Sequence, residues 1–368
     1  MKSIKEIAEI LSDDLSRREL GNPYFKDNYE TYDLTENNFN KILPFKSKRK
    51  ISCIDGGNQE LLPTPGYSIQ LNRVYFNIFK NKKLIPFKSD IPRRIEFLSY
   101  TSSILENDEL YFKTNLTLEN DDYRKYIDFE HDLKVKAVDS DFRLGNQILM
   151  ERMASMARRF SEWTVAEHII KSELKEGDII IKDGSLQTAH INENKYVESV
   201  FKEAIDKGVI VTGLSKTSRL PTDTQVPLIS AIEKFAKDID LPFDEWCYYP
   251  VAKTKKQNVK YQALIMVVKL NKYAETPFRF EMFEDQAKNI GEEGILDVIS
   301  AIADFSRDIT VPGYPYGLLD AHIWARVRKE EINSYQTMLF SEISKLGLWE
   351  DVNSHIKSIS MHDKLDEM

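Results

Sequence analysis

Two short apolar segments, each followed by aspartate and glycine, constrain the fold of this chain most strongly. The first is Ile51–Ile54, which precedes Asp55, and the second is Ile179–Lys182, which precedes Asp183. Apolar runs of this length bounded by glycine are typical of buried strands, although a single Asp-Gly pair is more often only a turn. A helical pattern between the two segments, and another after them, indicates parallel strands joined by crossovers. The pattern therefore predicts an α/β protein with both aspartates at the carboxyl edge of one sheet, where ligands bind in open sheets.

Hydrophobic periodicity assigns the remaining elements. Strands are expected at 73–80, 94–99, 110–118, 209–212, 261–270 and 277–283. Helices are expected at 3–16, 145–174, 194–207, 227–239, 292–306 and 317–345. The strands that follow Asp55 form an antiparallel set, whereas those near Asp183 belong to crossover units. The expected class is α/β, a mixed sheet flanked by helices with additional C-terminal strands and helices.

Composition excludes several classes of protein. The 368 residues, 42% of them hydrophobic, can bury a sizeable core. The sequence has no apolar run long enough to span a membrane and no secretory signal, so we expect a cytoplasmic protein. Its two cysteines, Cys53 and Cys247, form no metal-binding spacing and are expected to be small core residues. A net charge of -8 argues against a protein that simply coats DNA.

The long helix carries the candidate for a third acidic residue. At about 100° per residue its apolar side chains form one stripe. The stripe consists of Leu149, Met153, Met156, Phe160, Trp163, Ile170 and Leu174. Glu167 falls within it, where a carboxylate is costly unless it is paired or metal-bound. Glu162 lies about 140° away around the helix and is expected to face solvent. Glu167 is therefore the first choice and Glu162 the reserve.

Two strand-borne aspartates and one helix-borne glutamate are the layout of a two-metal phosphodiesterase site. Oxygen ligands of this kind suit Mg²⁺ or Mn²⁺ and argue against zinc. One alternative is a catalytically inactive nucleic-acid-binding or scaffold protein with the same fold. Another is an actin-like phosphotransfer ATPase, which would need two glycine-rich phosphate-binding hairpins. The converging carboxylates favour the nuclease over both.

With these residues placed, the chain resembles the NurA nuclease family. The resemblance rests on four stretches in order, together spanning residues 54 to 325. They are Ile54–Gly57, the long helix with its glutamate, Ile181–Leu186, and Gly313–Tyr316 through Ala321–Ala325. The resemblance implies a ribonuclease-H-like fold, a homodimer, and partnership with the hexameric HerA ATPase in DNA-end resection and double-strand-break repair. It also implies Mn²⁺-dependent 5′ to 3′ exonuclease and single-strand endonuclease activity.

The family's acidic triad carries over to Asp55, Glu167 and Asp183, and its C-terminal tyrosine and histidine to Tyr314 and His322. His322 could ligate a metal or give a proton to the leaving group, or it could be a satisfied core residue. Tyr314 could stack on a base, contact a phosphate, or pack in the core.

Lys216 and Arg219 could hold the phosphate backbone or be simple surface charge. One departure from the family is Gly57, where many relatives have serine, and we expect the metal site to tolerate it. The long segment between Asp55 and the helix also departs from the family, which puts in doubt how DNA enters.

The expected organisation is an N-terminal helix and loop-rich connection over 1–48, a nuclease domain over 49–345, and a tail over 346–368. In a homodimer, the basic clusters Lys46–Lys50 and Lys253–Lys260 would line a channel for DNA. A third cluster, Arg326–Lys329, is expected at the surface. The apolar stripe of the first helix (Ile4, Ile7, Ile10 and Leu11) either docks the ATPase or packs on its own domain. Such a protein would associate with the nucleoid.

Overall fold

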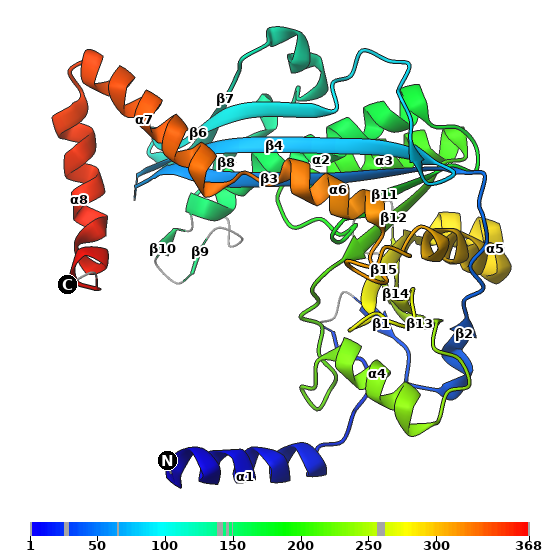
Figure 1. Cartoon of the computed structure of the whole chain (residues 1–368). Coiled ribbons are helices and arrows are strands. Elements are labelled where there is room, and N and C mark those ends of the chain that lie inside the picture. The colour runs from blue at the N-terminus through cyan, green and yellow to red at the C-terminus, as the bar shows by residue number, and fades with distance from the viewer. Residues whose placement is uncertain are drawn as a thin grey trace. The chain divides into compact units, whose positions relative to one another are not determined.

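A computed structural model describes residues 2–25, 29–64, 66–137, 143–144, 147–148, 150–255 and 262–366 (Figure 1). The chain divides into two compact units, each built from three stretches. Unit 1 comprises Met1–Ser47, Gly184–Leu186 and Thr212–Tyr316. Unit 2 comprises Lys48–Asp183, Gln187–Val211 and Gly317–Met368.

Unit 2 is organised around a mixed sheet in the order β11-β3-β4-β6-β7-β8. Its strands are β3 (Lys50–Pro63), β4 (Tyr67–Lys80), β5 (Lys83–Leu84, beside β4), β6 (Arg94–Glu106), β7 (Glu109–Leu118), β8 (Lys134–Lys136) and β11 (Ile179–Asp183). A separate hairpin pairs β9 (Arg143–Leu144) with β10 (Gln147–Ile148). β3, β4, β6, β7 and β8 pair antiparallel in that order, whereas β11 pairs parallel to β3. The mixed sheet flanked by helices confirms the expected class.

β3 differs from the sequence prediction in one important respect. Asp55 was expected at the end of a short strand, but β3 continues for eight residues beyond it, to Pro63. Gly56 and Gly57 remain in register with Val74 and Arg73 of β4, so their backbone groups belong to the sheet ladder. Glycine weakens a strand but does not end one whose backbone is paired on a neighbour. Asp55 therefore lies within a long strand, whereas Asp183 does end β11.

Helices cover both faces of this sheet. α2 (Met150–Glu173) packs on β3, β4 and α3 (Glu193–Lys207), while α7 (Lys329–Lys345) packs on β3. Figure 1 shows α6 (Tyr316–Ala325) and α7 crossing one side of β3 and β4, with α2 on the other. Side chains alternate along a strand. Gly56 accordingly meets α2, while its neighbour Gly57 meets the end of α6. α8 (Trp349–Asp366) follows α7.

Unit 1 has its own strand order, β1-β13-β14-β15-β12, with β2 beside β13. Its strands are β1 (Tyr29–Thr31), β2 (Phe39–Lys41), β12 (Ile210–Ser215, begun in unit 2), β13 (Trp246–Thr254), β14 (Ala263–Lys269) and β15 (Phe278–Phe283). Its helices are α1 (Lys2–Arg17), α4 (Leu228–Asp238) and α5 (Glu284–Asp304). Leu228 and Ile232 of α4 pack with Trp246 and Tyr248 of β13 in a buried cluster.

Most expected elements are present, but several boundaries are wrong: β4 begins at Tyr67 and α5 at Glu284, both earlier than expected, and β6 extends to Glu106. The helix predicted over 317–345 is two helices, because Arg326–Arg328 interrupt it before α7 begins. The longest elements that had not been predicted are β13 and α8, and the short strands β1, β2, β5, β8, β9 and β10 had not been predicted either. Short 3-10 turns at Glu36–Asn38, Asp121–Tyr126 and Glu130–Asp132 complete the elements. Within the described residues, no helix is both long and apolar enough to cross a membrane.

Candidate metal centre

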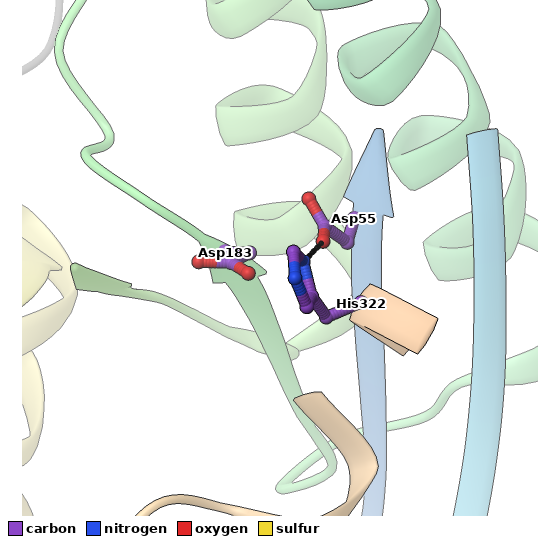
Figure 2. A group of neighbouring side chains, drawn as sticks. All are labelled: Asp55, Asp183 and His322. Atoms are coloured by element: carbon purple, nitrogen blue, oxygen red, sulfur yellow. Dashed lines mark hydrogen bonds and ion pairs between the residues drawn. The ribbon is translucent and has the colours of Figure 1, made fainter. Parts of the chain in front are cut away.

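Three residues of unit 2 converge on one point. Asp55, Asp183 and His322 each place a potential ligand atom within 4.8 Å of the other two (Figure 2). They come from β3, β11 and α6, which are far apart in sequence. His322 Nδ1 lies 3.0 Å from Asp55 Oδ2. The structure therefore brings together both predicted aspartates and the predicted histidine.

The strand register explains why the two aspartates meet. β11 runs parallel to β3 with Ile181 opposite Cys53 and Lys182 opposite Ile54. Because side chains alternate, Asp183 and Asp55 project from the same face of the sheet as Ile181 and Cys53. After Asp183 the chain turns at Gly184, whose φ of 98° favours glycine. The turn is held by Glu281, which is buried and accepts hydrogen bonds from Ser185 Oγ (3.1 Å) and Leu186 N (3.0 Å).

Cys53 lies on the same face but takes no part as a thiolate. Burial raises the pKa of the Cys53 thiol, and the charge of Asp183 raises it further. Its side chain is fully buried, as is that of Cys247. Both cysteines are therefore small core residues, as predicted.

α6 presents His322 to this site. The His322 side chain is 46% exposed, whereas that of Asp55 is 12% exposed. The interpretation of His322 as a core histidine is therefore wrong. An ionised Asp55 can only accept a hydrogen bond, so Nδ1 of His322 is the donor and the Nε2 lone pair is left for another partner. Metal-ligating histidines are commonly oriented by a carboxylate in this way.

Glu162 is buried, which corrects the expectation that it faces solvent. Its side chain is 1% exposed, and its Oε2 lies 2.5 Å from Lys182 Nζ. It also pairs with Arg158, one turn earlier on α2. A Cβ added to Gly56 would lie 2.5 Å from Glu162 Oε1, so the glycine makes room for this carboxylate on the α2 face of the sheet, whereas Asp55 projects from the α6 face. Lys182 and Arg158 had not been singled out from the sequence.

Glu167, the first choice from the sequence, is only half-buried and lies outside the three-residue group. The helical phase failed because α2 is covered on more than one side, by the sheet and by α3. The apolar stripe then merges the two buried faces of α2 and does not show which residues face β3. Leu149, assigned to that stripe, lies outside the described residues. Glu162, the reserve, also lies outside this group, so the structure places neither glutamate with the two aspartates.

The predicted nucleic-acid-binding residues lie in unit 1. Lys216 and Arg219 are both exposed. Tyr314 is 4% exposed and packs on Phe278, with ring centroids 5.6 Å apart. Lys216 Nζ lies 5.4 Å from the Tyr314 ring centroid, a cation–π contact. Tyr314 thus has the packing contacts of a core aromatic residue together with a cationic neighbour.

The fold and site define a mixed α/β protein with an aspartate–aspartate–histidine group at its central strands. The NurA domain model matches residues 49–327, and the chain therefore belongs to the NurA family. The crystal structure of the NurA nuclease from Sulfolobus solfataricus is similar to this chain at 14% identity and a TM-score of 0.54. The match covers 93% of this chain and 95% of that one.

Two other solved structures are also similar to this chain. A crystal structure of NurA matches with 10% identity and a TM-score of 0.50, covering 96% of this chain and 99% of that one. A structure of NurA bound to dAMP and manganese matches with 9% identity and a TM-score of 0.45, covering 90% and 95%. No match was found among curated protein sequences.

Proposed function

We propose that this protein is a metal-dependent DNA nuclease with a ribonuclease-H-like core. The observation that carries the proposal is the convergence of Asp55, Asp183 and His322 within 4.8 Å in a member of the NurA family. A scaffold protein would gain nothing from two carboxylates brought together at this spacing, because like charges repel. A divalent cation removes that repulsion.

The donor set fits a divalent cation. Two carboxylates supply hard oxygen ligands and the histidine supplies a nitrogen, a combination that accepts Mn²⁺ and, through the carboxylates, Mg²⁺. A cation held there would stabilise the negative charge that develops on the scissile phosphate. His322 would either ligate the cation through Nε2 or, in its protonated form and away from the metal, give a proton to the leaving oxygen, because a protonated imidazole has no lone pair for a metal.

We extend the proposal to two ions per site, with a glutamate of α2, either Glu167 or Glu162, as the additional carboxylate. Glu162 is buried against Lys182 and Arg158 and adjoins Gly56, the residue after Asp55. For Glu162 to bind an ion, Lys182 would have to give up its ion pair, because one carboxylate oxygen faces that ammonium at 2.5 Å. Glu167 remains the alternative ligand.

Lys216, Arg219 and Tyr314 are proposed to contact DNA. The exposure of the two cations supports a role on the phosphate backbone, and a tyrosine beside a cation can support a base or a phosphate. The family resemblance suggests 5′ to 3′ exonuclease and single-strand endonuclease activity in DNA-end resection and double-strand-break repair, at the nucleoid.

A HerA-type hexameric ATPase and a second copy of this chain are the proposed partners. Ile4, Ile7 and Ile10 of α1 are 62%, 64% and 65% exposed, so the alternative that this stripe packs on its own domain loses support. Ile7→Glu combined with Ile10→Glu should weaken ATPase binding while leaving cleavage of short single strands unchanged. The homodimer should scatter light as twice the 42.8 kDa chain. The cluster Lys253–Lys260, proposed to line the channel, lies partly outside the described residues.

The test of the nuclease is cleavage of end-labelled single- and double-stranded DNA with Mn²⁺, Mg²⁺ or EDTA. Cleavage should require the metal, and Asp55→Asn and Asp183→Asn should each lower it by about a hundredfold or more, since losing one ligand costs several kcal/mol of transition-state stabilisation. Asp206→Asn, on an exposed position of α3, is the matched control and should cleave normally.

Either of two results would contradict the proposal. If both site variants keep a tenth of wild-type cleavage, the site is misassigned. If the wild type binds DNA without cutting it, or hydrolyses ATP instead, the protein is the inactive scaffold or the phosphotransfer ATPase.

A further inference from the structure

α6 is fastened to β4 by a small group of polar contacts, which we call the α6 clamp. Asn77 Nδ2 lies 2.7 Å from the Gly317 carbonyl oxygen and 2.8 Å from Asp320 Oδ2, and donates to both. The Tyr75 hydroxyl donates to the same Asp320 oxygen at 3.2 Å. The clamp therefore consists of Tyr75 and Asn77 on β4, and Gly317 and Asp320 on α6.

The clamp is buried on its sheet side. Asn77 is 0% exposed and Tyr75 is 6% exposed. A buried amide is costly unless its donors are paired, and here its NH₂ group reaches two acceptors on one helix. If α6 moved away, this buried amide would lose both of those partners. The contacts are therefore directional as well as stabilising.

The clamp and the metal centre share one face of the sheet. Tyr75 is the cross-strand partner of Asp55, and Asn77 is the partner of Cys53. Cross-strand partners project from the same face. Asp320 lies two residues before His322 on α6, so a rotation of the helix that breaks the clamp also carries His322 away from Asp55.

Apolar packing alone does not define the rotation of α6. Apolar residues occur on every side of this helix, including Leu318, which is fully buried, and Ile323 and Trp324, which are 48% and 50% exposed. Hydrophobic attraction is non-directional, so a helix that is apolar all round can settle at several angles. Trp324 adds a stacked contact on Tyr75, with ring centroids 6.2 Å apart. The polar contacts at Gly317 and Asp320 select one angle.

We infer that Asp320 is a positioning residue that orients α6 so that His322 faces Asp55 as a metal ligand. Asn77 and Tyr75 are its anchors on the sheet. The inference rests on the proposed function of Asp55, Asp183 and His322 as a metal centre. Asp320 itself acts through His322 and is not assigned to the metal.

The test is Mn²⁺ binding to the full chain, measured by the loss of the free-ion electron paramagnetic resonance signal, in parallel with DNA cleavage over a range of Mn²⁺ concentrations. Asp320→Ala should weaken Mn²⁺ binding by about 10- to 100-fold, as removal of an orienting partner typically does. Cleavage should recover toward the wild-type rate at saturating Mn²⁺. Asp320→Asn keeps an oxygen acceptor for Asn77 and Tyr75 and should bind Mn²⁺ within about threefold of wild type.

Two further variants keep the test decisive. Glu330→Gln removes one exposed carboxylate from the first turn of α7 and should leave Mn²⁺ binding unchanged. Tyr75→Phe removes a single hydroxyl, so if Asp320→Ala does not fold, it should still weaken Mn²⁺ binding by a few-fold.

The possible results separate this inference from the proposed function. Wild type that binds Mn²⁺ and cuts DNA, with an Asp320→Ala variant that folds and binds equally well, would overturn the role of Asp320 alone. Wild type that binds no Mn²⁺ would overturn the metal centre itself and this inference with it. Weakened binding in Asp320→Ala that Asp320→Asn rescues supports the inference.

Discussion

Gly57 is the position where the smallest change should disturb the metal centre most. It lies two residues beyond Asp55 on β3, against the last residue of α6. A Cβ at Gly57 would lie 2.2 Å from the Ala325 carbonyl oxygen and 3.0 Å from its carbonyl carbon. The obstacle is backbone and cannot rotate away. Gly57→Ala must therefore move the end of α6 or bend β3.

The size of the effect follows from these distances. Real Cβ atoms essentially never approach closer than 3.0 Å, so the oxygen must retreat by at least 0.8 Å. The shift reaches His322 through the backbone. The Ala325 carbonyl and the Arg326 nitrogen belong to one peptide unit, and that nitrogen donates to the His322 carbonyl oxygen at 3.0 Å. Overpacking of this kind costs about 1–3 kcal/mol of unfolding free energy. A misplacement of about 1 Å at the site costs about a hundredfold in rate.

Urea unfolding and Mn²⁺-dependent cleavage together measure both effects. Gly57→Ala should lose about 1–3 kcal/mol of stability and most of its cleavage. Gly57→Ser should behave similarly, because it adds the same Cβ. The matched control is Gly66→Ala, whose added Cβ would have no atom within 4 Å. A Gly57→Ala variant with the stability and cleavage of Gly66→Ala would refute the reasoning.

Two further predictions concern stability. Glu162→Gln should destabilise the fold by about 3–5 kcal/mol, because it leaves the Lys182 charge uncompensated inside the protein. Glu167→Gln should change stability by about 0.5 kcal/mol or less. Equal urea midpoints for the two variants would contradict the assignment of Glu162 to the buried face of α2. Glu193 is fully buried and pairs with Arg159 at 2.6 Å. Burial raises the pKa of Glu193, but the Arg159 charge and hydrogen bonds outweigh it and lower that pKa below 4.5. The stability that the Glu193 charge contributes is therefore present at neutral pH and lost as pH falls below about 4.5. The loss of unfolding free energy in Glu193→Gln, measured with urea, should shrink as the pH is lowered. A loss that stays constant with pH would count against this assignment.

The sequence was sufficient to locate the aspartates but not to describe their setting. Asp183 was placed correctly because an apolar run followed by Asp-Gly ends a strand whose backbone then turns at positive φ. The same signal misplaced the end of β3, since Gly56 and Gly57 lie in an extended ladder with β4. Whether a glycine ends a strand depends on the partner strand, which local sequence does not specify.

The helix-borne residues were harder to predict for a related reason. Periodicity identifies buried faces, but α2 has several, and only tertiary packing shows that Glu162 adjoins Gly56. The break at Arg326–Arg328 between α6 and α7 carries no proline or glycine to signal it. His322 came from the family resemblance, and the contacts that orient it depend on strand pairing between residues far apart in the chain.

The division of the chain into interleaved units limits how this protein can be taken apart or recombined. Each unit draws on three separate stretches, and the chain changes unit directly after Asp183, a residue of the proposed metal centre. No single cut yields either unit whole, and a fragment that ends at Asp183 lacks His322. A gene fusion or exchange that treats residues 1–183 as a module would separate the site's aspartates from its histidine. Any engineered version must therefore keep residues 55 to 322 in one chain if the three side chains are to meet.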